Sequence, residues 1–430
     1  MARLSKKTLS GLPPLKVGAM FGGLISFIAF TMLHWRGIGL PPDGWAYWQG
    51  AVSIVEGHGY SYFSGTPISA WPPLYSLYLA FWTALLGPTG FSLVIANGFL
   101  ITCQGVLWSY VLVKIIRGSE VRVTYITSAT IGVYIGLFIS IHQQQSLATS
   151  LQYTLLPVFL LEIWRLCKSG HSEDSLTRVG SASILGTGLV LSHNASFAFV
   201  GAGALLVLLR SSDYKKNLVS SFLLGAIPAM CWLAVRLYLN QTGSHAIGIG
   251  AGKFSYGTYL FQLITGVGGT VVPRQLGANY VASILLFLFL TYSYFIVYDF
   301  LPNFVLGSLF LNYVMFNVTF VRNPIGSIRY VMFIPIITLP IIFLGVYEKN
   351  RYAFIFSVCA LFLPLLYWTY SWTGHYLSAE RSKLIESKYG IHNAIVSPEY
   401  PEGPPKHTAE GILLSPKQWE EPKTGDGILR

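Results

Sequence analysis

A single acid, Asp43, stands in the stretch PPDGWAYWQG, among aromatic and glycine residues and directly after the first long apolar run. A carboxylate in such a place could take a proton from a hydroxyl group that acts as a nucleophile. Far along the chain, Arg322 and Arg329 flank the stretch NPIGSI. Their planar guanidinium groups could bind an anionic ligand, and lipid headgroups are the simplest alternative.

The composition places these residues in a membrane protein. Of 430 residues, 53% are hydrophobic and 10% are charged, whereas ordinary soluble domains have about 25% charged residues. The net charge of +11 comes from lysines and arginines in short gaps between apolar runs, without a basic face, so we expect no nucleic-acid partner. The four cysteines lie in or beside apolar runs without metal-ligand spacing, and we interpret them as core residues.

The charge distribution predicts the topology. The basic segment before residue 17 and the basic gaps near 117–122, 165–178, 210–216 and 349–351 should face the cytoplasm, so Asp43 should be external. About 11 spans follow from the apolar runs of the sequence. The predicted crossings are 17–34, 91–115, 123–141, 152–166, 179–192, 195–209, 217–239, 278–298, 302–320, 331–346 and 352–371.

One apolar run does not fit as a crossing. The stretch LYSLYLAFWTALLG, bounded by Pro72, Pro73 and Pro88, is too short to span a bilayer, so we expect a helix that lies in the membrane interface. Segment 35–88 is then a long first external loop within one transmembrane domain, residues 1–375. Residues 376–430 are polar and rich in proline, and we expect an external, partly disordered tail.

Polar residues gather on the predicted external side. Any loop needs polar residues, but external arginines run against the usual bias of basic residues toward the cytoplasm, which favours an anionic ligand. The set comprises Asp43, Glu56, His58, His142, Gln143 to Gln145, His193, Asn194, Lys253, Arg274, Arg322 and Arg329.

The stretch DGWAYWQGAVSIVEGHGYSYFSGTPISAWPPLYSLYLAFWTALLG resembles the first external loop of the GT-C membrane glycosyltransferases. The branch in question contains protein O-mannosyltransferases and aminoarabinose or lipid-A-modifying transferases. The matching features are Asp43, an aromatic residue four positions on (Tyr47), Gly57 with Gly59, and the Pro-Pro-Leu from Pro72. Three later stretches resemble further parts of the family in the right order: GTGLVLSHNASFAFV, IPAMCWLAVRLYLNQTG and NPIGSIRYVMFIPI.

The resemblance implies an inverting transfer of a sugar from a polyprenyl-phosphate donor to a hydroxyl of a lipid, glycan or protein acceptor. Asp43 would be the general base. Cationic groups would bind the donor phosphate as its negative charge grows; the candidates are Arg329, Arg322, Arg274 and His193. Candidates for substrate binding are Tyr47, Glu56, His58, Trp71 and His142. Aromatic residues of the loop (Trp45, Tyr47, Trp48, Tyr60 and Trp71) could stack on a sugar or anchor the loop in the interface.

The sequence also departs from the family. The next external loop, SIHQQQSLATSLQYT, has no acid, and Ala70 and Trp71 stand where one branch carries an acid. Glu56 lies thirteen residues beyond Asp43, which is about 220° around a continuous helix. The two carboxylates should therefore not converge unless GHG breaks the helix early. We expect catalysis without a metal or cofactor.

Two other functions stay open. A transporter or flippase of a lipid-linked anionic substrate would use Asp43 and the arginines as gates. Transporter sites, however, lie near the bilayer midplane among polar residues, and this chain has few, chiefly Asn97 and Glu162. An O-antigen ligase or polymerase would share the lipid-linked sugar chemistry. Because nothing marks a eukaryotic compartment, we expect a bacterial inner membrane, with the site on the periplasmic side of the cell envelope.

Overall fold

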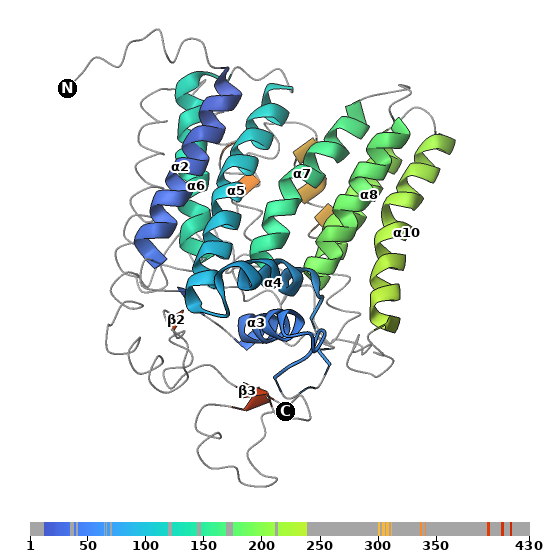
Figure 1. Ribbon diagram of the computed structural model, residues 1–430. Helices are drawn as coiled ribbons and strands as arrows, with labels where there is room; N and C mark the ends of the chain where they lie inside the picture. Colours follow the sequence, from blue (N-terminus) through green and yellow to red (C-terminus); the bar gives the residue numbers. More distant parts are fainter. Residues whose placement is uncertain are drawn as a thin grey trace, which may run out of the picture.

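The computed structural model describes residues 13–34, 38–39, 42–63, 65, 67–68, 71–118, 123–143, 148–168, 175–210 and 214–238, isolated positions between 300 and 340, and three short strands between 394 and 414. Most of these residues form a bundle of helices (Figure 1). The helices are α2 (Pro14–His34), α3 (Pro42–Val55), α4 (Leu74–Leu86), α5 (Gly90–Arg117), α6 (Tyr125–His142), α7 (Ala148–Lys168), α8 (Ser175–Ser192), η1 (Asn194–Ser196), α9 (Phe197–Arg210) and α10 (Tyr214–Tyr238).

Four of the described helices are long and apolar enough to cross a membrane: α2, α5, α6 and the 218–235 part of α10. Helices α7 and α8 run alongside them, and each predicted crossing between residues 17 and 239 coincides with one helix (Figure 1). The prediction of an all-helical, polytopic membrane protein is confirmed. Apart from isolated positions, the predicted crossings from 278 onward lie outside the described residues, so the total of about 11 stays a prediction.

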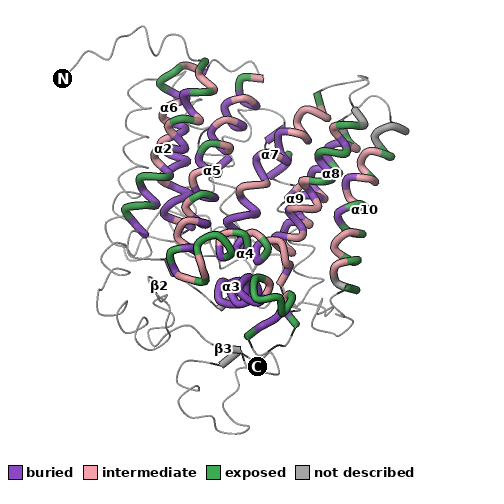
Figure 2. Tube along the Cα trace, in the orientation of Figure 1, coloured by how far each residue is buried: buried purple, intermediate pink, exposed green. Residues whose placement is uncertain are grey.

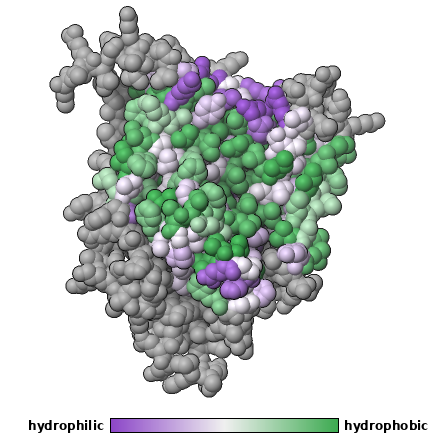
Figure 3. All heavy atoms as spheres, in the orientation of Figure 1, coloured by the Kyte–Doolittle hydropathy of each residue, from purple (hydrophilic) through white to green (hydrophobic). Residues whose placement is uncertain are grey.

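The surface has the polarity expected of a membrane protein. Apolar atoms cover the middle of the face seen in Figure 3, and hydrophilic atoms gather toward its upper and lower ends. Large side chains along α2, among them Met20, Leu24, Phe27 and Met32, are exposed, and the same helix is buried on its other side (Figure 2). One face of α2 is therefore suited to lipid and the other to neighbouring helices.

The buried face of α2 packs closely on α5 and α6 through small residues. A methyl group added at Gly22 would overlap the carbonyl oxygen of Gly105 and the hydroxyl of Ser109, both in α5. A methyl group at Gly132 of α6 would overlap the backbone of Gly18 and Gly22. Glycines at such positions let helix backbones approach, which is how helices in a bilayer gain packing energy that lipid cannot supply.

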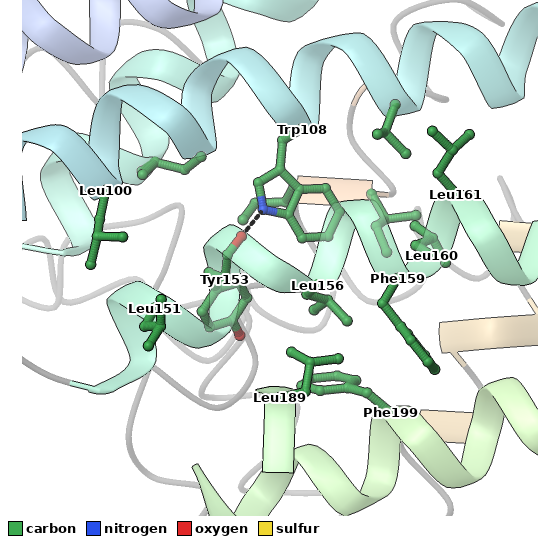
Figure 4. Close-up of a cluster of buried hydrophobic side chains, with 14 of the residues drawn as sticks. Leu100, Trp108, Leu151, Tyr153, Leu156, Phe159, Leu160, Leu161, Leu189 and Phe199 are labelled. Carbon is green, nitrogen blue, oxygen red and sulfur yellow. Dashed lines mark hydrogen bonds between the residues drawn. The ribbon is translucent and has the colours of Figure 1, made fainter. Parts of the chain in front are cut away.

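Helices α5 and α7 are joined by a hydrogen bond that depends on a proline. Pro157 lies inside α7 and has no N–H, so the carbonyl of Tyr153, four residues earlier, lacks its helical partner. The indole Nε1–H of Trp108 donates to this carbonyl at 2.9 Å, as Figure 4 shows. Trp108 is fully buried, and the bond satisfies both groups inside the bundle.

Short strands complete the described part. Strand β1 (Ile38–Gly39), between α2 and α3, pairs in parallel with β2 (Ala394–Ile395), and β3 (Lys406–His407) pairs antiparallel with β4 (Leu413–Leu414). Sequence reasoning predicted none of these strands. The first pair joins a segment of the C-terminal tail to the link that leads into α3.

We expect Gly22→Ala to lower the free energy of unfolding by about 1–3 kcal/mol, the usual cost of forcing a group into a packed interface. Gly225→Ala in α10 is the matched control, since a methyl group there meets no atom within 4 Å. The control should be neutral or slightly stabilising. Thermal unfolding in detergent measures both, and equal effects of the two changes would contradict close packing at Gly22.

Trp108→Phe should destabilise the protein by about 1–3 kcal/mol, because it removes the N–H that donates to the buried Tyr153 carbonyl. Pro157→Ala restores an N–H that can reach this carbonyl within α7. The Trp108→Phe change should therefore cost less in the Pro157→Ala background. A double-mutant cycle on unfolding free energies measures the difference, and additive effects would show that the two residues are not coupled.

Candidate functional site

Helices α3 and α4 lie across one end of the bundle (Figure 1). The 13-residue α4 thus has the arrangement predicted for an interfacial helix. Helix α3 begins at Pro42, at the first helical position, which tolerates proline because an N–H there has no partner within the helix. Asp43 is the next residue, so the predicted base lies in the first turn of α3.

Two glycines end α3 and turn the chain back. The amide of His58 donates to the Ser53 carbonyl at 2.9 Å, and the amide of Gly57 donates to the Ile54 carbonyl at 3.1 Å. This pair of bonds is a Schellman motif, which needs a left-handed residue after the helix, and Gly57 has φ of 83°. The GHG stretch therefore does break the helix, but only after Val55.

The described residues of segment 56–73 fold back along α3. The hydroxyls of Ser53 and Ser61 are 2.6 Å apart and buried. The amide of Phe63 donates to Oε1 of Gln49 at 3.1 Å, and the Phe63 ring packs edge-on against Trp45 and Trp48. These contacts pack the loop that follows the helix on α3 between Trp45 and Ser53.

Helix α4 holds this unit on the bundle. The Ser76 hydroxyl donates to the Tyr47 carbonyl of α3 at 2.8 Å, and the Tyr75 hydroxyl donates to Oδ1 of Asn97 in α5 at 2.8 Å. The Tyr60 hydroxyl donates to the Trp71 carbonyl at 3.1 Å. Burial raises the pKa of Tyr60 well above its ordinary value, so the phenol keeps its proton and remains a donor.

The structure gives the predicted aromatic residues packing contacts. The Tyr47 ring is buried, with centroid distances of 5.3 Å to Tyr75 and 6.5 Å to Trp71, both edge-on. Trp45 and Trp48 are also buried, whereas Trp71 is partly exposed. Packing alone accounts for the position of Tyr47, and sugar binding by Tyr47 or Trp71 stays a prediction.

Glu56 and His58 lie at the far end of α3 from Asp43. Their side chains are exposed, with 3.7 Å between Glu56 Oε2 and His58 Nδ1. Helix α3 ends at Val55, about 18 Å along the axis from Asp43, and Glu56 follows it. The structure therefore does not bring these two positions of the chain together, and neither residue stands beside the predicted base.

The other predicted histidines lie at the same end of the bundle as α3 and α4. His142 is the last residue of α6, and its ring packs on Phe138 with 4.4 Å between centroids. His193 caps η1, because its Nδ1 accepts the amide N–H of Ala195 at 3.1 Å. This bond leaves Nδ1 without a proton, so in the neutral ring the proton is on Nε2.

The turn around His193 is tied to two further helices. Gln152 of α7 donates to the Ser196 hydroxyl at 2.9 Å, and Trp232 of α10 donates to Oδ1 of Asn194 at 3.1 Å. These bonds fix the turn that positions His193. The three predicted phosphate-binding arginines, Arg274, Arg322 and Arg329, lie outside the described residues, and so do their contacts.

Within the described ranges, no three His, Cys, Asp or Glu residues are grouped so that they could hold a metal ion. Catalysis without metal or cofactor stays a prediction. Where α7 begins beside the middle of α5, the structure also buries uncharged polar residues that sequence reasoning did not select as site residues, chiefly Gln104 of α5 and Ser150 of α7. A glutamine in the middle of a 28-residue apolar helix was the available signal.

No protein-family model matches the sequence, and no curated protein matches it. Among solved structures, the chain is similar to the crystal structure of ArnT from Cupriavidus metallidurans in the apo state. The two have 12% sequence identity and a TM-score of 0.47, over 82% of this chain and 75% of that one. No statement about chemistry follows from a likeness of this size.

His193→Asn should separate capping from ligand binding. Asparagine keeps an acceptor for the Ala195 amide, so stability should be retained, whereas His193→Ala should lose about 1 kcal/mol. If Nε2 donates to a phosphate, both variants should bind undecaprenyl phosphate more weakly than the wild type. Thermal unfolding and titration with this lipid measure the two effects, and unchanged binding by His193→Asn would limit His193 to the cap.

Proposed function

We propose that the protein is an integral-membrane glycosyltransferase that moves a sugar from a polyprenyl phosphate to an acceptor hydroxyl at the external membrane face. The observation that carries the proposal is the position of Asp43 in the first turn of α3, a helix that lies across one end of a membrane bundle. The resemblance of this segment to the first loop of the GT-C family supports the same function.

The position suits a substrate that is anchored in lipid. A polyprenyl chain stays in the bilayer, so its phosphate and sugar lie at headgroup depth, near the ends of the spans. Helices across the end of the bundle lie at that depth, and a base in α3 could meet the sugar there. The donor would then not have to leave the membrane to react.

The proposed reaction is a single displacement. The acceptor oxygen attacks the anomeric carbon while Asp43 takes its proton, and the bond from that carbon to the phosphate oxygen breaks, with inversion. The lipid phosphate leaves with its negative charge increased. Arg329, with Arg322, Arg274 and His193, is proposed to bind that charge.

The described residues give less support to transport. Asn97 uses its amide within the fold, accepting from Tyr75 at 2.8 Å and donating to the Leu93 carbonyl at 2.9 Å. Glu162 pairs with Arg165 near the end of α7 that is remote from α3. Asn97 and Glu162, which the sequence analysis named as the chief polar residues that a transporter could use, therefore have structural partners.

Asp43→Asn keeps the shape of the side chain but removes the proton acceptor. The rate of sugar transfer should fall by about 10²- to 10⁴-fold, while the donor still binds, because the lost interaction belongs to the transition state. The measurement is transfer from undecaprenyl-phosphate sugars by purified protein in nanodiscs, with donor binding determined separately.

Glu162→Gln is the matched control, since it removes an acid near the opposite end of the bundle, and it should transfer sugar at the wild-type rate. Near-normal transfer by Asp43→Asn would exclude Asp43 as the base. Movement of the lipid-linked sugar across a vesicle membrane, without transfer of the sugar to an acceptor, would favour the flippase instead.

A further inference from the structure

We propose that Gln104, Gln143 and Ser150 form a subsite that binds hydroxyl groups of the sugar on the lipid-linked substrate. The inference rests on the proposed function, because that function is what brings a sugar to this end of the bundle. The three residues come from α5, from the residue after α6, and from the first turn of α7.

A small hydrogen-bonded core holds the three residues together. Gln104 Nε2 donates to Oε1 of Gln143 at 2.9 Å and to the backbone carbonyl of Ser150 at 2.8 Å. All three are buried, with exposed fractions of 0% for Gln104, 4% for Gln143 and 1% for Ser150. The two bonds use both hydrogens of the Gln104 amide nitrogen and fix the orientation of both glutamine amides.

Each of the three side chains keeps one buried polar atom without a hydrogen-bond partner. These atoms are Gln104 Oε1, Gln143 Nε2 and Ser150 Oγ. The bond between the two amides limits the distance between Gln104 Oε1 and Gln143 Nε2 to about 7 Å. Buried polar groups without partners are rare in native structures, and three in one cluster point to a ligand.

The chemistry of the three atoms indicates what the ligand is. Gln104 Oε1 accepts, Gln143 Nε2 donates, and Ser150 Oγ can do either. Hydroxyl groups also both donate and accept, so two neighbouring hydroxyls of a sugar ring would match this set. None of the three side chains is charged, so the cluster is suited to the neutral sugar and not to the phosphate.

Two other buried polar side chains of α5 and α7, Asn97 and Gln152, are paired within the protein. Gln152 donates to Ser196, and Asn97 bonds to Tyr75 and to the Leu93 carbonyl. A cluster that served packing alone would be expected to be satisfied in the same way. The position also fits, because Gln143 directly follows His142 at the end of α6.

Ser150→Ala tests the subsite without disturbing the core, because Ser150 Oγ makes no hydrogen bond within the protein. Thermal stability should be unchanged or slightly raised. The probes are undecaprenyl phosphate carrying glucose, mannose or aminoarabinose, each compared with bare undecaprenyl phosphate. Affinity for the sugar-bearing probe should fall roughly 3- to 10-fold, the effect of one hydrogen bond, while affinity for the bare lipid is unchanged.

Ser183→Ala is the matched control, since Ser183 Oγ in α8 is also buried and without a partner, and it should change neither affinity. If the wild type binds a sugar-bearing probe better than the bare lipid and Ser150→Ala keeps that preference, the subsite is overturned and the proposed function stands. A lower melting temperature for Ser150→Ala with the preference retained overturns it too, in favour of a structural role. If the wild type prefers no sugar-bearing probe, both proposals fail.

Discussion

The fold depends on the close approach of α2 to α5 and α6. In a bilayer, lipid tails are as apolar as leucine side chains, so helices associate through tight packing and hydrogen bonds. Glycines at the crossing remove the side chains that would keep the backbones apart. Serine hydroxyls then reach across to backbone carbonyls, as Ser128 does to Pro14 at 2.5 Å and Ser140 to Ser26 at 3.1 Å. Helices α2, α5 and α6 therefore pack as one unit.

The candidate site is attached to helices α2, α5 and α6 through a chain of contacts. Helix α4 is bonded to α5 at two points. The Tyr75 hydroxyl donates to Asn97 Oδ1 at 2.8 Å, and the Tyr78 hydroxyl donates to the Ala96 carbonyl at 2.6 Å. Helix α4 holds α3 through the Ser76 bond and an edge-on contact of the Tyr47 and Tyr75 rings, and Phe63 of the loop after α3 packs on the same helix. The position of Asp43 therefore depends on contacts that begin deep in the membrane.

Sequence reasoning predicted the helices between residues 17 and 239 because long apolar runs and charged gaps are local signals. It also predicted that 74–87 would not cross, since proline and length both argued against it. It did not predict the bond from Trp108 to Tyr153, the partners of Gln104 or the pairing of Ile38 with Ala394, because each joins residues that are distant in the chain. For the site, the sequence predicted the position of Asp43 at a bundle end, but it could not show that Tyr47 is enclosed by Tyr75 and Trp71.

Pro157 has a consequence for how the chain can diverge. A bilayer scarcely distinguishes one apolar face of a helix from another, so the rotation of α7 about its axis needs a directional contact to define it. The Tyr153 carbonyl, which Pro157 leaves without its helical donor and which accepts from Trp108, is such a contact, and it follows Ser150 and Gln152 within one turn of α7. The rotation that points these polar residues inward is thus set by Trp108 and Pro157, which are not among the proposed ligand-binding residues. Substitutions at Ser150 and Gln152 can therefore change which substrate binds without changing the rotation of α7.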